Sequence, residues 1–62
     1  MKKFYKDFYG NTASIFTKKS DPNFAELIIR DAYGKMIWKK KYTSPKGAKI
    51  AMGKQSDCWT ER

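Results

Sequence analysis

The alternation of residues 24–42 on either side of a short turn constrains the fold of this chain more than any other feature. In an extended chain Ala25, Leu27 and Ile29 share one face, and the residues between them share the other. Residues 31–34 form a four-residue connection, with Gly34 where a left-handed backbone is needed. The sequence therefore predicts two antiparallel strands, 24–31 and 35–42, joined as a hairpin.

The second strand of this hairpin is expected to have an aromatic face and a basic face. Met36, Trp38 and Tyr42 fall on one side, together with Lys40. The other side carries Lys35, Ile37, Lys39 and Lys41. With the aromatic side on the core, these lysines project from the open side of the sheet, where Arg30 can join them. A phosphate backbone attracts such a face, but lysines also protect an edge strand against aggregation.

The first part of the chain predicts further strands. Residues 12–17 are rich in β-branched and aromatic side chains and indicate a strand, which the turn-forming residues 18–23 end. Residues 4–9 repeat an aromatic pair, which suits either a helical turn or a strand. The strand is favoured because Gly10 fits the first central position of a two-residue type II′ hairpin turn.

A helix is predicted after the hairpin. Ser44 can cap the first free N–H groups, and Pro45 fits the first helical position, where its missing N–H costs nothing. The helix has a narrow apolar stripe of Ala48, Ala51 and Met52 and is expected to end between residues 54 and 57. The predicted fold class is α+β: a three- or four-stranded antiparallel sheet with one C-terminal helix packed on one face.

Length and charge indicate a single small basic domain, residues 1–62, with loose ends expected at 1–3 and 60–62. The formal charge is +8, and residues 32–56 carry seven lysines and no acid. Such a balance favours nucleic acid or another polyanion, or an acidic protein surface. Solubility alone is the other interpretation. Trp59 is expected to fold back on the core, which in so short a chain depends on its aromatic residues.

The residue inventory argues against an enzyme, a cofactor and a metal site. The chain has no histidine and one cysteine, Cys58, so a zinc site of the His/Cys type is excluded and no internal disulfide can form. The acids are scattered, the serines lack a histidine partner, and no glycine-rich phosphate loop is present. No signal peptide or membrane span is predicted. We therefore expect a cytoplasmic protein without a small-molecule substrate.

Basic and aromatic residues outside the lysine-rich strand face each have two interpretations. Lys18 and Lys19 end a strand beside a turn, where they either clamp a phosphate or remain solvated. Trp38 either anchors the core on the helix side or stacks on a sugar or base from the open side. The aromatic repeat of residues 4–9 either completes the core or a dimer contact, or offers a stacking surface beside nearby lysines.

Three short motifs resemble the DNA-binding domain of plant ethylene-response factors. They are Ala25-Glu26-Leu27-Ile28-Ile29-Arg30-Asp31, Gly34-Lys35-Met36-Ile37-Trp38, and Tyr42-Thr43-Ser44 followed by Ala48 and Ala51. The arm-binding domains of tyrosine-family phage integrases share that family's fold. The resemblance implies an open sheet face in the major groove, with Arg30, Lys35 and Trp38 as contacts. The same glycine hairpin, Tyr-Thr-Ser segment and alanine helix are similar to YegP-like small bacterial domains, which implies the fold alone.

The sequence thus predicts a non-enzymatic domain that binds nucleic acid, foremost duplex DNA, through a basic sheet face, with a phage or mobile element as the expected source. The residues predicted to contact nucleic acid are Arg30, Lys35, Trp38, Lys39, Lys41, Lys18 and Lys19. The alternative is a protein-binding or homodimeric accessory module, in which aromatic residues form the contact and the lysines serve only solubility. A third hypothesis is an RNA-binding adaptor.

Overall fold

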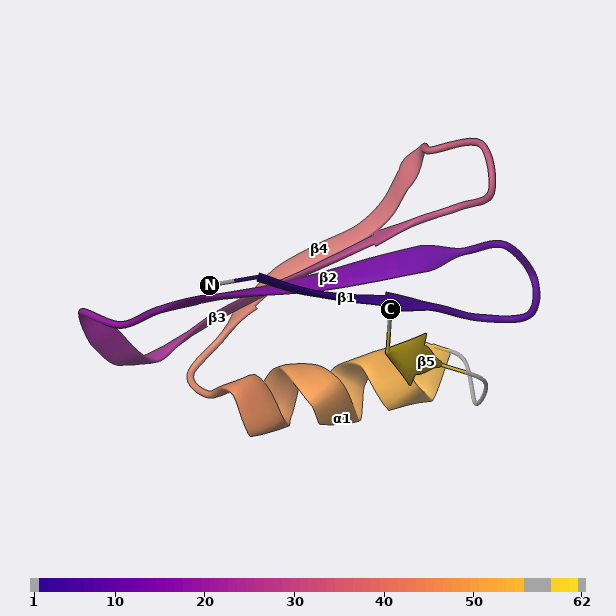
Figure 1. The fold of residues 1–62 in the computed structure, drawn as a ribbon. Helices are drawn as coiled ribbons and strands as arrows, with labels where there is room; N and C mark the ends of the chain where they lie inside the picture. The colour runs from indigo at the N-terminus through magenta and orange to yellow at the C-terminus, as the bar shows by residue number, and fades with distance from the viewer. Residues whose placement is uncertain (1, 56–58, 62) are drawn as a thin grey trace.

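The computed structural model describes residues 2–55 and 59–61 of the chain, which form an antiparallel sheet with a helix across one face (Figure 1). The elements in chain order are β1 (Lys2–Lys6), β2 (Thr12–Lys18), β3 (Asp21–Arg30), β4 (Met36–Tyr42), α1 (Pro45–Gln55) and β5 (Thr60–Glu61). The five strands form one sheet in the order β4-β3-β2-β1-β5. The predicted α+β class is confirmed, including the helix on one face; β5 was not predicted.

The core lies between α1 and the first three strands. Its buried residues are Tyr5, Ala13, Ile15, Ala25, Leu27, Ile29, Ala48 and Met52. The alternation predicted along β3 is confirmed, since Ala25, Leu27 and Ile29 are all buried. Along β4 only Tyr42 is even half-buried, because the helix leaves most of that strand uncovered. No helix in the described part of the chain is long and apolar enough to cross a membrane.

The predicted helix start is confirmed in detail. The Gly47 N–H donates to Ser44 Oγ at 3.1 Å, and Pro45 occupies the first helical position. After the helix, the Trp59 indole N–H donates to the Met52 carbonyl at 2.7 Å, and the ring packs against the core as predicted. The helix ends at Gln55, within the predicted interval. Cys58 lies outside the described residues.

The β1–β2 turn is organised by an aspartate and differs from the predicted one. Asp7 is buried, and its Oδ1 accepts hydrogen bonds from the N–H groups of Tyr9 and Asn11, both at 2.9 Å. The Asp7 N–H donates to the Asn11 carbonyl and closes a three-residue loop. Gly10 takes a φ of 86° at the end of this loop. The predicted two-residue type II′ turn is therefore wrong. The Asp7 carboxylate instead holds a three-residue loop, and Gly10 is the last residue of that loop.

The β3–β4 turn repeats this arrangement. Asp31 Oδ1 accepts from the N–H groups of Tyr33 and Lys35, again at 2.9 Å, and Gly34 has a φ of 85°. Both turns thus come from an Asp-x-Tyr-Gly sequence, and both lie at the same end of the sheet (Figure 1). The prediction that Gly34 supplies the left-handed residue is confirmed.

Strand pairing extends further toward the chain ends than the sequence suggested. Lys2 and Lys3 pair with β2, and Thr60–Glu61 pairs with the end of β1, whereas loose ends were predicted at 1–3 and 60–62. β3 begins at Asp21, three residues before its predicted start at 24. The long β2–β3 hairpin reaches the opposite end of the sheet from the two aspartate turns (Figure 1).

Candidate functional site

The sheet face opposite α1 is not covered by any described element (Figure 1). Directly paired residues on neighbouring strands project from the same face. The pairing therefore gives the rows Lys2–Phe16–Glu26–Lys41, Phe4–Ser14–Ile28–Lys39 and Lys6–Thr12–Arg30–Met36. We call the side chains of these three rows the open face.

Lysines occupy the two sides of the open face. Lys2 and Lys6 project from β1, and Lys39 and Lys41 project from β4. The two strands that carry them are separated by β2 and β3, so the two pairs of lysines originate about 14 Å apart at about 4.8 Å per strand spacing. We call these two pairs the lysine rails. The β1 rail was not predicted, although the alternation of residues 2–6 contains it.

The centre of the open face is aromatic and hydroxyl-bearing. Because Ser14 is small, a hollow of about 160 Å³ forms beside it, lined by Phe4, Thr12, Ala13, Ser14, Ile28 and Arg30. The Phe4 ring is 47% exposed, and Lys2 Nζ lies 5.8 Å from its centroid. One acid, Glu26, stands opposite Lys41 in the first row. The face therefore presents apolar and polar groups between two cationic borders.

Arg30 lies at the end of the open face nearest the aspartate turns. Its guanidinium donates through Nη1 to the Gly34 carbonyl at 3.3 Å and carries further N–H groups that can donate to a ligand. A β-bulge follows, because Ile29 pairs with Trp38 but Arg30 pairs with Met36. The extra residue interrupts the alternation. Met36 therefore lies opposite Arg30 on the open face. The prediction that Met36 shares a face with Trp38 is wrong.

The bulge also separates Lys35 from the lysines of β4. Met36, not Lys35, is the residue paired with Arg30. Lys35 belongs to the turn, where its N–H is bound by Asp31. Of the predicted contact residues, the structure brings Arg30, Lys39 and Lys41 together on the open face.

Trp38 lies on the helix side of the sheet. It pairs with Ile29, which is buried under α1, and is itself 36% exposed. Together with residues of α1 it lines a hollow of about 320 Å³. The tryptophan that packs on the core is Trp59. Trp38 therefore faces away from Lys39 and Lys41, as its parity indicated. It is not a core anchor, because the helix covers β4 only near Tyr42.

The other two predicted contacts lie apart from this group. Lys18 ends β2 with its Nζ 4.5 Å from the Phe24 ring centroid, and Lys19 lies in the adjoining turn. This turn is at the opposite end of the sheet from Arg30 (Figure 1). Lys18 and Lys19 therefore extend the positive surface along the long hairpin without joining the lysine rails.

Three exposed aromatic side chains gather on the aspartate turns. Phe8, Tyr9 and Tyr33 are 85%, 75% and 96% exposed. The two turns are close, since a Cβ on Gly10 would lie 3.1 Å from Ala32 Cβ. We call these three side chains the aromatic tip, which extends from the same end of the sheet as Arg30.

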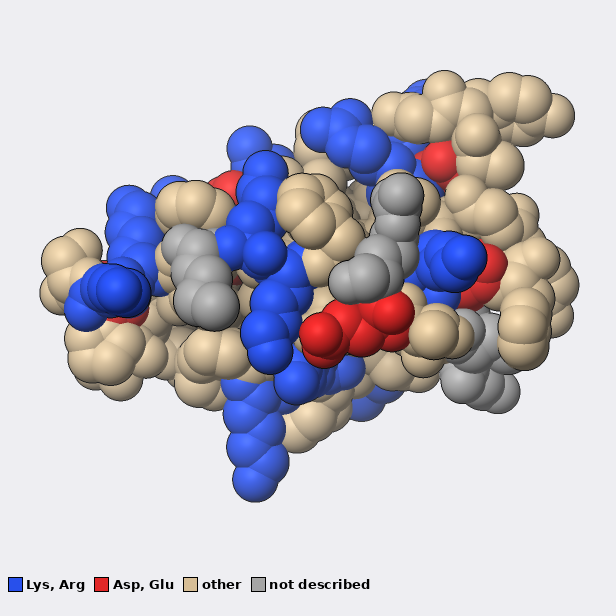
Figure 2. All heavy atoms as spheres, viewed as in Figure 1, with Lys and Arg blue, Asp and Glu red and all other residues tan. Residues whose placement is uncertain are grey.

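Positive charge is distributed over both the sheet and the helix. In Figure 2 the blue Lys and Arg side chains occupy more of the visible surface than the red Asp and Glu side chains, which form one area near the centre and smaller ones elsewhere. Comparison with protein-family models, curated proteins and solved structures finds no match to this chain. The function of the candidate site is therefore inferred from its geometry.

Proposed function

We propose that this chain is a non-enzymatic domain that binds duplex DNA through its open face. The observation that carries the proposal is the pair of lysine rails, Lys2 and Lys6 on one side and Lys39 and Lys41 on the other. Ammonium groups bind phosphates without regard to sequence. The lysines form two cationic borders, and apolar and polar side chains lie between them. This arrangement fits a ligand with two phosphate backbones and base edges between them.

The dimensions support this pose. The major groove of B-DNA is about 12 Å wide and admits a two-stranded ribbon, which matches β2 and β3, and the rails on either side of these strands originate about 14 Å apart. A sheet in the groove would place the rails at the two phosphate backbones. Between them Arg30 can donate to a guanine edge, Glu26 can accept from a cytosine amino group, and Phe4 can contact a thymine methyl group.

Salt dependence tests the proposal. Binding of a short fluorescent duplex is measured by anisotropy at several salt concentrations between about 50 and 200 mM. The four rail lysines predict a slope of log K against log salt of about −3.6, at about −0.9 for each phosphate neutralised. The Lys39→Gln/Lys41→Gln variant should bind more weakly and lose about two units of slope.

The matched control is Lys46→Gln/Lys54→Gln, which removes the same charge from α1 on the other side of the sheet. It should change the slope far less than the β4 variant does. Equal effects of the two variants would show that net charge, not the rails, governs binding. Absence of saturable binding below high micromolar duplex would refute the proposal.

A protein contact is the second candidate function, and the aromatic tip favours it. Phe8, Tyr9 and Tyr33 are large and exposed and lie on two neighbouring turns, as in contact patches between proteins. In this reading the chain is an accessory or homodimeric module and the lysines serve solubility. Sedimentation of the wild type and of Phe8→Ser/Tyr33→Ser over a range of protein concentrations tests for self-association, which should respond little to salt.

A further inference from the structure

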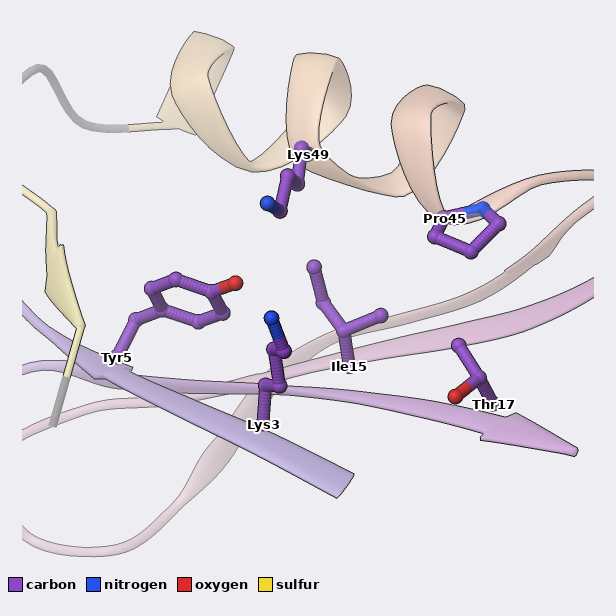
Figure 3. Close-up of a pocket in the computed structure, with 6 residues that line it drawn as sticks. All are labelled: Lys3, Tyr5, Ile15, Thr17, Pro45 and Lys49. Carbon is purple, nitrogen blue, oxygen red and sulfur yellow. The ribbon is translucent and has the colours of Figure 1, made fainter. Parts of the chain in front are cut away.

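A cavity of about 250 Å³ lies on the other side of the sheet, between α1 and the β1–β2 pair (Figure 3). Its lining residues are Lys3, Tyr5, Ile15, Thr17, Pro45 and Lys49. Lys3 pairs directly with Ile15, and the sheet alternation brings Tyr5 and Thr17 to the same face. Pro45 and Lys49 close the cavity from the first half of α1. It is therefore built from three separate elements.

The Tyr5 hydroxyl is a buried polar group with nothing to bind. Tyr5 is 6% exposed, and its hydroxyl oxygen has no hydrogen-bond partner within residues 2–55 and 59–61. Figure 3 shows it pointing toward the space between Lys3, Lys49 and Ile15. A buried hydroxyl is costly to leave unpaired, so this cavity has a specific place for a hydrogen-bond acceptor.

The charged groups around the cavity are cations. Among residues 2–55 and 59–61, the lining includes the Lys3 and Lys49 ammonium groups and no carboxylate. Glu61 stands opposite Tyr5 in β5, but it is exposed and does not line the cavity. Ammonium groups only donate hydrogen bonds, and the tyrosine hydroxyl is free to donate. The described lining therefore brings hydrogen-bond donors and positive charge together and supplies no negatively charged acceptor.

The rest of the lining is mostly apolar. Ile15 and Pro45 have hydrocarbon side chains, and Thr17 has a methyl group beside its hydroxyl. An inorganic anion would leave this surface without a partner. A molecule with one anionic end and a hydrocarbon part satisfies both halves of the cavity.

We propose that this cavity binds a small organic carboxylate with a short apolar chain. One carboxylate oxygen accepts the Tyr5 hydroxyl proton in a hydrogen bond, the ammonium groups of Lys3 and Lys49 neutralise the charge, and the chain contacts Ile15 and Pro45. The site lies across the sheet from the lysine rails. It is therefore independent of the proposed DNA binding.

The test is an NMR titration of the whole chain with hexanoate, and with hexanol and hexylamine as ligands of equal chain length. Hexanoate should give saturable shifts at the Ile15 methyl groups and the Tyr5 ring, at least about tenfold tighter than hexanol because a hydrogen bond to a charged group is added. Tyr5→Phe should weaken hexanoate about 10- to 100-fold and leave hexanol unchanged.

Variants of exposed lysines provide a control that does not disturb the core. Lys3→Gln and Lys49→Gln should each weaken hexanoate, whereas Lys46→Gln, which is outside the cavity, should not. Lys39→Gln/Lys41→Gln should leave hexanoate binding intact even where it abolishes binding of a duplex. The proposal is overturned if the three ligands bind alike, if hexanoate shows no saturable shift at millimolar concentration, or if Tyr5→Phe binds it equally well.

Discussion

Replacing Gly10 by alanine tests whether the two aspartate turns pack against each other. Gly10 has a φ of 86°, and a Cβ there would lie 3.1 Å from Ala32 Cβ. Carbon atoms attract at about 3.5–4.0 Å, so the added methyl group must push the second turn away. Gly34 is the matched control, since its φ is 85° and a Cβ there would meet nothing within 4 Å.

The difference between the two variants isolates the contact. A left-handed backbone costs a residue with a Cβ about 1–2 kcal/mol, so Gly34→Ala should lower the free energy of unfolding by that amount. Gly10→Ala adds the cost of overpacking, about 1–3 kcal/mol. In a domain of this size each kcal/mol corresponds to about 4–8 °C in Tm. Gly10→Ala should therefore melt clearly below Gly34→Ala.

Urea unfolding followed by far-UV circular dichroism gives both free energies. Ala32→Gly completes the double-mutant cycle, because it removes the atom that the new methyl group meets. The double variant Gly10→Ala/Ala32→Gly should recover the excess cost but not the backbone cost. Equal destabilisation by Gly10→Ala and Gly34→Ala, or no coupling above about 0.5 kcal/mol in the cycle, would refute the packing of the two turns.

Further stability measurements test single groups by the same unfolding assay. Ser44→Ala removes the acceptor for the Gly47 N–H and should cost about 1 kcal/mol. Tyr5→Phe removes a buried hydroxyl that has no partner among the described residues, so the free protein should keep its stability or gain up to about 1 kcal/mol. A loss of more than about 1 kcal/mol would mean that the hydroxyl forms a hydrogen bond in the free protein. Asp7→Ala should cost about 2–3 kcal/mol and Asp31→Ala about 1 kcal/mol, because Asp7 is buried and also accepts from a side-chain amide.

The parts of the fold that depend on neighbours in the chain could be predicted from the sequence. Alternation identified the buried face of β3, the Ser44–Pro45 pair identified the helix start, and Gly34 marked the second turn. In each case one local preference, for pleat, cap or positive φ, decides the structure. The Asp-x-Tyr-Gly sequence is the same at the first turn, but there the position of Gly10 alone does not indicate that Asp7 binds two N–H groups and lengthens the loop.

The parts that depend on pairing between strands could not be predicted. The bulge beside Arg30 changes which residue of β4 faces it, and no residue at positions 36 and 37 demands a bulge. The pairing of Thr60 and Glu61 with β1 joins the two ends of the chain. These features decide which predicted contacts share a surface. Arg30, Lys39 and Lys41 share the open face, whereas Lys35 and Trp38 do not. Lys2 and Lys6, on the same face, were not predicted.

The alternation that organises the sheet also divides its charge between two surfaces. On β1, Lys2 and Lys6 point to the open face, whereas Lys3 lines the cavity beneath α1. Cations on a flat, exposed face meet water and favour an extended polyanion, because each contact is weak and many are needed. At the cavity, where the Tyr5 hydroxyl also needs an acceptor, one carboxylate is enough to bind Lys3. Net charge alone therefore does not identify one partner. Variants of single lysines on each face are needed to separate binding of a polyanion from binding of a carboxylate.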